Sequence, residues 1–256
     1  MTPGDARPWA TDEQAMRLLL LSNSATHGQP YLSHALDAIA AHLAGRAHLL
    51  FIPYALADHD GYTATVAEAL RPAGITVEGL HSQPDRVAAI TSAEAVFVGG
   101  GNTFRLLRSL RKAGLIGHLR DRVRGGLPYL GSSAGTNLAC PTIRTTNDMP
   151  IVDPEGFDAL GLIPFQINPH YLDADPASTH QGETRAQRLT EFCQDNDVPV
   201  LAMREGSWLH AADDMAALRG IRGGVLFRHG QEPAEVTAGT DVSWLLATAP
   251  RFTIRD

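Results

Sequence analysis

Short apolar segments alternate with stretches of helical periodicity along the first half of the chain. Buried strands are predicted at the apolar or β-branched runs 18–21, 49–52, 75–77, 95–98 and 127–130. Between these runs, apolar positions spaced three and four residues apart predict helices over 31–43, 62–70 and 103–113. This alternation is typical of a mostly parallel sheet with helices on both faces, so we predict an α/β fold.

The pattern changes after Pro141. Residues 149–160 are loop-like, and the apolar run 163–167 predicts a strand that ends at Asn168-Pro169, just before His170. Shorter apolar runs follow, which we interpret as extra C-terminal β-strands in a meander, at 200–203, 208–210, 215–218 and 225–227. Because no repeat or linker interrupts the chain, we expect a single domain over residues 1–256, with residues 1–15 as a poorly ordered N-terminal extension.

The candidate catalytic residues lie where the predicted strands end. This position matters because ligand sites in parallel sheets lie at the carboxyl ends of the strands. The run 127–130 leads directly into Gly131-Ser132-Ser133-Ala134-Gly135. Gly-x-Ser-x-Gly between a strand and a helix is typical of a nucleophile elbow, a tight turn that exposes the serine. Ser133 is therefore the candidate nucleophile. An ordinary strand-to-helix turn is the alternative, since glycine and serine are common in turns.

Two places offer backbone amides for an oxyanion hole. Gly100 or Gly101, in the triple glycine that follows the run 95–98, would supply one N–H group, and Ala134 beside the nucleophile would supply the other. Phe104 occupies the last glycine position of a Gly-x-Gly-x-x-Gly motif, which argues against a dinucleotide site. A flexible tight turn is the alternative explanation of the glycines.

A nucleophilic serine needs a base, and the base needs a group that orients it. Among eleven histidines, His170 stands out because it follows Asn168-Pro169 at the end of a predicted strand; a surface-loop histidine is the alternative. Asp148 and Glu205 are the acidic candidates. Either could equally be a solvated loop carboxylate or a cap, and the residues alone do not decide between them.

Composition narrows the classes of partner. With a net charge of −7 over 256 residues, we expect no general binding to nucleic acid or anionic membranes. No run of roughly 18 apolar residues predicts a membrane span. The two cysteines, Cys140 and Cys193, and an N-terminal segment without an apolar secretory signal lead us to expect a soluble cytoplasmic protein. His-Glu-x-x-His, paired His/Cys spacings and the phosphate-binding P-loop motif are absent, so neither a metal nor an organic cofactor is expected.

One longer string carries a family resemblance. Residues 131–150 read GSSAGTNLACPTIRTTNDMP, and with segments 18–24, 99–104, 166–170 and 182–185 they closely resemble the peptidase E family of α-aspartyl dipeptidases. The likeness covers roughly residues 17–230. It implies a fold related to class I glutamine amidotransferases, with serine in place of their cysteine, and hydrolysis of dipeptides that begin with aspartate.

The resemblance also implies roles for individual residues. Ser133 would be the nucleophile and His170 the base, while Asp148 and Glu205 both match family residues that could be the third member of the relay. Arg185 matches the arginine associated with the aspartyl carboxylate of the substrate, and a guanidinium can bind a carboxylate through two hydrogen bonds. Without the resemblance, Arg185 would be interpreted as a helix-surface residue.

Departures from the family pattern leave the substrate range open. Ser132 stands where tryptophan is usual, Thr136 where alanine or glycine is usual, and Arg204 where proline is expected. The expected partner is a small peptide with an N-terminal aspartate, bound by a monomer or a homodimer. A cyanophycinase-like or other acyl hydrolase, and a non-catalytic protein that binds aspartyl peptides, are the alternatives on the same fold.

Overall fold

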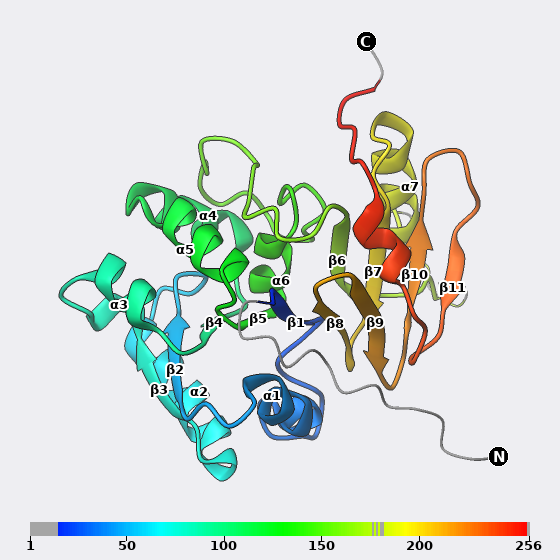
Figure 1. Cartoon of the computed structure of the whole chain (residues 1–256). Helices are drawn as coiled ribbons and strands as arrows, with labels where there is room; N and C mark the ends of the chain where they lie inside the picture. Colours follow the sequence, from blue (N-terminus) through cyan, green and yellow to red (C-terminus); the bar gives the residue numbers. More distant parts are fainter. Residues whose placement is uncertain (1–14, 176, 178, 180–181, 255–256) are drawn as a thin grey trace.

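Two β-sheets organise the protein. The computed structural model describes residues 15–175, 177, 179 and 182–254, so the extension expected at residues 1–15 lies outside the described residues except for Ala15. A seven-stranded sheet has the order β3-β2-β4-β5-β1-β8-β9, and a four-stranded sheet has the order β11-β10-β7-β6. Figure 1 shows the two sheets and the helices around them.

The elements follow one another closely along the chain. The strands are β1 (Arg17–Leu21), β2 (His48–Ile52), β3 (Thr76–Gly79), β4 (Val96–Val98), β5 (Tyr129–Ser132), β6 (Gln166–Tyr171), β7 (Val200–Arg204), β8 (Ser207–Ala212), β9 (Met215–Gly220), β10 (Gly224–Phe227) and β11 (Ala234–Val236). The α-helices are α1 (Leu36–Leu43), α2 (His59–Leu70), α3 (Arg86–Ser92), α4 (Thr103–Lys112), α5 (Leu115–Arg124), α6 (Ala134–Ala139) and α7 (Arg185–Asp195). Four short 3-10 helices cover Ser33–Ala35, Arg71–Ala73, Leu80–Ser82 and Ser243–Ala247.

The centre of the larger sheet is buried on both faces, as the four consecutive leucines of β1 show. Leu18 and Leu20 pack in one core cluster with residues of α3, α4, α5 and α6. Leu19 and Leu21 point the other way and pack with residues of α1 and α2. Because successive side chains of a strand point to opposite faces, an unbroken apolar run fits a strand between two helical layers (Figure 1). Strands β1 to β5 pair in parallel, so the predicted α/β fold with a mostly parallel sheet is confirmed.

The strand predicted at 163–167 is displaced, because β6 spans Gln166–Tyr171 and includes His170. Ile163 and Phe165 are buried in the core without belonging to a strand, so their apolar character reflects packing rather than pairing. Pro169 lies inside β6, at the edge of the smaller sheet, where a residue without an N–H group is tolerated. The register with β7 shifts between Asn168 and Tyr171.

The single meander predicted for the C-terminal strands is wrong. Strands β7 and β10 pair antiparallel in the smaller sheet, whereas β8 and β9 form a hairpin that joins the larger sheet beside β1. The extra C-terminal strands exist, but they are divided between the two sheets. Helix α7 packs on the smaller sheet through Leu189 and Cys193 (Figure 1). The apolar periodicity predicts that a segment is a strand but does not identify its neighbour.

Candidate active site

Ser133 lies in a strained turn between β5 and α6. Its backbone angles are φ 52° and ψ −106°, a conformation that residues other than glycine rarely adopt. The glycines on both sides permit it: a Cβ atom on Gly135 would lie 2.0 Å from the carbonyl oxygen of Val98, and one on Gly131 would lie 2.7 Å from the carbonyl oxygen of Gly135. The local geometry is therefore the strand, sharp turn and helix of a nucleophile elbow.

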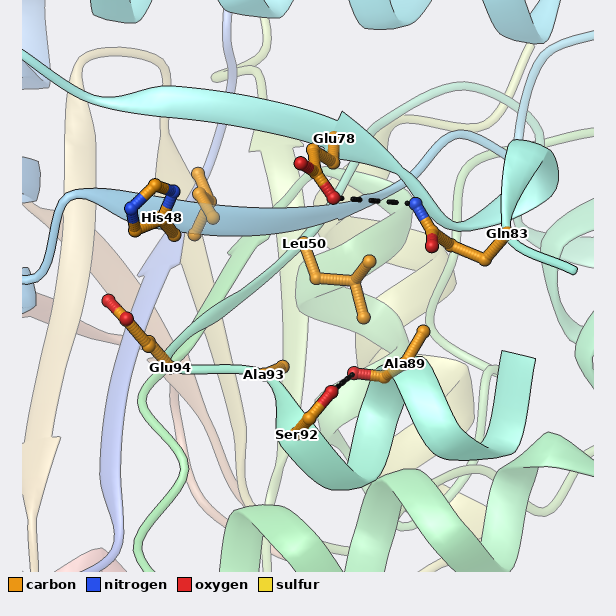
Figure 2. Close-up of a pocket in the computed structure, with 9 residues that line it drawn as sticks. His48, Leu50, Glu78, Gln83, Ala89, Ser92, Ala93 and Glu94 are labelled. Carbon is orange, nitrogen blue, oxygen red and sulfur yellow. Dashed lines mark hydrogen bonds between the residues drawn. The ribbon is translucent and has the colours of Figure 1, made fainter. Parts of the chain in front are cut away.

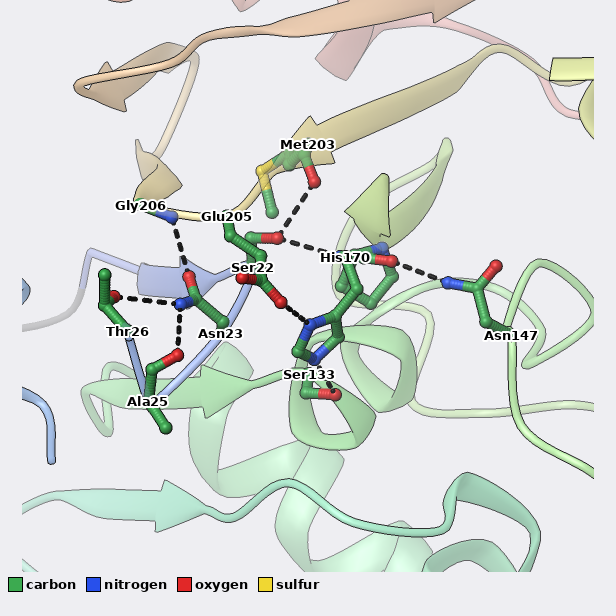
Figure 3. Close-up of polar contacts among 11 residues, drawn as sticks. Ser22, Asn23, Ala25, Thr26, Ser133, Asn147, His170, Met203, Glu205 and Gly206 are labelled. Carbon is green, nitrogen blue, oxygen red and sulfur yellow. Dashed lines mark hydrogen bonds and ion pairs between the residues drawn. The ribbon is translucent and has the colours of Figure 1, made fainter. Parts of the chain in front are cut away.

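His170 and Glu205 form a chain of hydrogen bonds with Ser133 (Figure 3). His170 Nε2 lies 2.9 Å from Ser133 Oγ, and His170 Nδ1 lies 2.7 Å from Glu205 Oε1. His170 also has a positive φ of 55°. Such an arrangement of hydroxyl, imidazole and carboxylate can activate a serine, because the ring can accept the hydroxyl proton while the carboxylate stabilises the imidazolium that forms.

Asp148, the other acidic candidate, lies elsewhere in the site. Its Oδ2 accepts hydrogen bonds from the Thr103 backbone N–H at 2.7 Å, from Thr103 Oγ1 at 2.6 Å and from Thr146 Oγ1 at 3.1 Å. The carboxylate thus sits at the first residue of α4 and makes no hydrogen bond to His170. The structure brings Ser133, His170 and Glu205 into contact and leaves Asp148 outside that chain.

Three residues that the sequence reasoning missed hold the segments of His170 and Glu205 in place (Figure 3). Ser22 Oγ donates to the Met203 carbonyl at 2.9 Å and accepts the backbone N–H of His170 at 2.9 Å. Asn23 Oδ1 accepts the backbone N–H of Gly206, next to Glu205, at 2.8 Å. Asn147 Nδ2 donates to the Pro169 carbonyl at 2.7 Å.

The signal for two of these residues was visible in the sequence. In the sequence, Ser22 and Asn23 directly follow the apolar run of β1. In the structure, both are fully buried, which is unusual for polar side chains without a structural task. Nothing in the sequence pattern indicated that their partners belong to β6, to β7 and to the turn after β7. Those contacts arise because the two sheets meet at the carboxyl end of β1.

The predicted oxyanion residues lie around the nucleophile. A Cβ atom on Gly100 would lie 3.1 Å from Ser133 Cβ, so the glycine backbone runs directly past the nucleophile. Gly101, with φ 126°, lines the same pocket as Ser133. Ala134 is fully buried and is the first residue of α6, whose first amides have no acceptor within the helix. The structure therefore places all three predicted residues beside Ser133.

A pocket of about 600 Å³ opens beside Ser133 and carries charges of both signs. Three carboxylates line it: Asp148, Asp173 and Glu205. Arg185, Arg204 and Arg222 line it as well. Such a pocket suits a small ligand that bears both positive and negative groups.

Arg185 is the first residue of α7, and one nitrogen of its guanidinium has no hydrogen-bond partner among the described residues. Thr184 caps the helix, and its side chain and that of Gln187 bond reciprocally to each other's backbone N–H groups. Arg185 Nη1 is buried and has no hydrogen-bond partner among the described residues. Burial lowers the pKa of Arg185 from its ordinary value, while the nearby carboxylates of Glu205 and Asp148 oppose that shift. An unpaired buried guanidinium nitrogen is a site for an anionic group.

Arg204 has a different arrangement from Arg185. Its Nε and Nη2 donate to the two oxygens of Asp173 at 2.7 Å each, and its Nη1 and Nη2 donate to Glu235 at 2.9 and 2.7 Å. The guanidinium also lies 5.9 Å from the ring centre of Tyr171. Because Asp173 follows His170 closely and Arg204 precedes Glu205, this clamp joins the segments that carry the base and its carboxylate partner.

A second pocket, of about 240 Å³, lies between β2, β3 and α3 (Figure 2). It contains both a histidine and a serine, His48 and Ser92, but Ser92 Oγ donates to the Ala88 carbonyl at 3.0 Å rather than to the imidazole. This pocket therefore has no activated nucleophile. Within the described residues, no group of three or more His, Cys, Asp or Glu side chains is placed to hold a metal. No helix of the described part combines the length and apolarity needed to cross a bilayer.

Comparisons with known proteins identify the family and the fold of the chain. The model of peptidase family S51 matches residues 18–219. Peptidase E of Streptomyces coelicolor is 59% identical over 237 residues, covering 93% of this chain and 98% of that protein. A protein of Drosophila melanogaster named probable alpha-aspartyl dipeptidase is 50% identical over 235 residues, covering 91% and 98%. The crystal structure of a peptidase from an acI-B1 Actinobacterium has a TM-score of 0.64 at 16% identity, covers 90% of this chain and 98% of that one, and supports the fold.

Proposed function

Because the chain belongs to peptidase family S51, we propose that it is a serine dipeptidase that hydrolyses dipeptides with an N-terminal aspartate. The observation that carries the mechanism is the hydrogen-bonded chain from Ser133 Oγ to His170 Nε2 and from His170 Nδ1 to Glu205, at 2.9 and 2.7 Å. The family and the names of the relatives support the reaction class. The roles of individual residues rest on the geometry.

Ser133 attacks the carbonyl carbon of the aspartyl residue in the first half of the reaction. His170 Nε2 takes the hydroxyl proton as the new C–O bond forms, and the imidazolium then gives this proton to the departing amine when the C–N bond breaks. A water molecule then loses a proton to the same imidazole and attacks the acyl carbon. As the bond from this carbon to Ser133 Oγ breaks, the imidazolium returns the proton to Oγ and aspartate is released. Glu205 accepts the Nδ1–H bond throughout, which fixes the ring orientation and stabilises the imidazolium.

The tetrahedral oxyanion is bound by backbone amides. The N–H group of Ala134 and that of Gly100 or Gly101 are the proposed donors, because the glycine segment runs past Ser133 and Ala134 begins α6. Loss of one oxyanion donor typically costs about 10²- to 10³-fold in kcat. A side-chain substitution does not remove a backbone N–H group. The proposed oxyanion hole instead requires a small residue at position 100, where the backbone passes close to Ser133.

Arg185 is the proposed partner of the aspartyl side-chain carboxylate. Its buried and unpartnered Nη1 would gain a charge-assisted hydrogen bond from the substrate. A site built to pair a charged group rejects analogues that lack it, because the buried Nη1 of Arg185 is then left unsatisfied. Arg185 therefore distinguishes aspartyl peptides from asparaginyl and alanyl peptides.

Hydrolysis of Asp-Leu, Glu-Leu, Asn-Leu and Ala-Leu by the wild type tests the function. Ser133→Ala should abolish release of leucine while the circular dichroism spectrum and Tm stay those of the wild type. Arg185→Ala should lower kcat/KM selectively for Asp-Leu, and Arg188→Ala, one turn further along the exposed face of α7, is the matched control. Full activity of Ser133→Ala would remove Ser133 from the mechanism, and equal losses on all four peptides would indicate structural damage at Arg185.

We also expect the protein to act in the cytoplasm, as a monomer or a homodimer. Cys140 and Cys193 are both free and buried, which suits a reducing compartment. Cell fractionation and light scattering on the purified protein test these two expectations. Recovery in a secreted fraction, or an assembly larger than a dimer, would contradict them.

A further inference from the structure

Asp148 is a rigidly held carboxylate with one free oxygen. Its Oδ2 receives three hydrogen bonds, from the N–H and hydroxyl groups of Thr103 and the hydroxyl of Thr146. Its Oδ1 accepts no hydrogen bond from the described residues, and it is not among their buried unsatisfied atoms. The carboxylate also lies at the N-terminus of α4, a ten-residue helix whose dipole favours a negative charge there. Asp148 is therefore a fixed anion whose Oδ1 remains available to a ligand.

The other carboxylates of the pocket are already engaged. Both oxygens of Asp173 accept hydrogen bonds from Arg204 at 2.7 Å. Glu205 is bonded to His170, whose ring it orients in the proposed mechanism. Of the three carboxylates that line the pocket, Asp148 alone forms neither an ion pair with a described residue nor a contact with the catalytic histidine.

The charges of the pocket match those of a substrate with a free N-terminus. An N-terminal aspartyl residue carries a carboxylate on its side chain and an ammonium group on its α-carbon. Arg185 offers a buried unpartnered donor for the carboxylate. Once that carboxylate is placed, the α-ammonium needs an acceptor in the same pocket, since desolvating an ammonium without a partner is costly.

We propose that Asp148 binds the α-ammonium group of the substrate through Oδ1 and so restricts the enzyme to peptides with a free N-terminus. The inference rests on the proposed function. It assigns Asp148 to substrate binding and leaves Glu205 as the carboxylate that acts on His170. The threonine hydroxyls and the Thr103 amide hold the carboxylate through Oδ2 at the wall of the pocket and leave Oδ1 for the substrate.

The test uses a substrate pair that differs only in the ammonium group. Succinyl-leucine is Asp-Leu with the α-ammonium replaced by hydrogen. Asp148→Asn keeps the shape of the side chain but loses the charge, and Asp153→Asn is the matched control, because Asp153 lies in the following loop, outside the pocket, and bonds to the Glu155 amide. The kcat/KM values for both substrates are measured for the wild type and both variants, together with the rate at which an amine-free fluorophosphonate labels Ser133.

We expect the wild type to prefer Asp-Leu over succinyl-leucine. Asp148→Asn should lower kcat/KM for Asp-Leu by about 10- to 100-fold, the usual range for a hydrogen bond to a charged group, and leave succinyl-leucine unchanged. Labelling of Ser133 should stay at the wild-type rate, and Asp153→Asn should behave as the wild type throughout.

Two results would overturn the inference alone. One is slow labelling of Ser133 in Asp148→Asn, as expected of a group that orients His170. The other is an unchanged preference for Asp-Leu over succinyl-leucine in that variant. A wild-type enzyme that cleaves no aspartyl dipeptide would instead overturn the proposed function, and the inference with it.

Discussion

Replacement of Glu205 by glutamine isolates the contribution of its charge to catalysis. Glutamine keeps an oxygen that can accept the His170 Nδ1–H bond, so the ring orientation can be retained while the attraction between carboxylate and imidazolium is lost. The two side chains are 37% and 51% exposed, for His170 and Glu205 respectively, so water screens the pair in part. The expected loss is therefore smaller than for a fully buried carboxylate.

The size of the effect follows from Coulomb's law. Two unit charges about 4 Å apart interact by about 1 kcal/mol at the dielectric constant of water and by about 4 kcal/mol at an effective value of about 20. The exposure of Glu205 places the pair between these limits. Since about 1.4 kcal/mol is a factor of ten in rate, Glu205→Gln should lower kcat/KM by about 5-fold to about 1,000-fold.

The rate at which Ser133 is covalently modified is the appropriate measurement. Stopped-flow labelling with a fluorophosphonate reports nucleophile activation without substrate recognition, and Asp-Leu hydrolysis reports the complete reaction. Both rates should fall by the same factor in Glu205→Gln, whereas Glu191→Gln, an exposed change on α7, should leave both unaltered. A wild-type labelling rate in Glu205→Gln, with labelling abolished in His170→Ala, would refute the assignment of Glu205.

Three further predictions concern stability. Gly135→Ala should unfold at a lower Tm or fail to fold, because its Cβ would lie 2.0 Å from the Val98 carbonyl oxygen. Gly117→Ala is the control in α5, where a Cβ atom meets nothing within 4 Å. It should raise the free energy of unfolding, measured by urea titration, by up to about 1 kcal/mol. Burial lowers the pKa of His42 from 6.5 to about 3, so its contribution to stability is complete above pH 6.5 and is lost as the pH falls toward 3. The wild type should lose about 2 kcal/mol between pH 7.5 and 5 from this residue, and a His42→Leu variant with the same pH dependence would contradict that assignment. Arg204→Met should lower Tm by a few degrees and slow Ser133 labelling, because Arg204 joins the segments that carry His170 and Glu205. An unchanged labelling rate would show that Arg204 contributes to stability alone.

The sequence predicted best those parts that depend on local chemistry. The run 18–21 indicated a strand buried on both faces because four leucines in succession leave no polar side for solvent, and β1 has that environment. The turn around Ser133 was also predicted from the sequence, because it depends on local contacts. The backbone of Gly135 lies close to Gly131, and the backbone of Val98 in the adjacent strand lies close to Gly135, so both positions require glycine. The helices α3 and α5 were not predicted, and α7 was indicated only by the interpretation of Arg185 as a helix-surface residue.

The rest depends on contacts between distant parts of the chain. The sequence left Asp148 and Glu205 equivalent, because each is an acidic residue in a polar loop segment. Their environments differ only after the chain folds: one meets the first residue of α4, and the other meets His170. The displacement of β6 has the same origin, since pairing with β7 and the contact of the His170 amide with Ser22 determine where the strand ends.

The hydrogen bonds of Ser22 have a consequence for how activity and stability respond to change. Ser133, the proposed nucleophile, follows β5 of the larger sheet, whereas His170 lies on the smaller sheet and Glu205 directly after its strand β7. Ser22, at the end of β1, bonds to both β6 and β7 and so links the two halves of the catalytic apparatus. Substitutions that shift one sheet against the other by a fraction of an ångström would lengthen the bond between hydroxyl and imidazole while both sheets stay folded. The catalytic rate should therefore respond to small shifts at the junction between the sheets that leave the Tm unchanged.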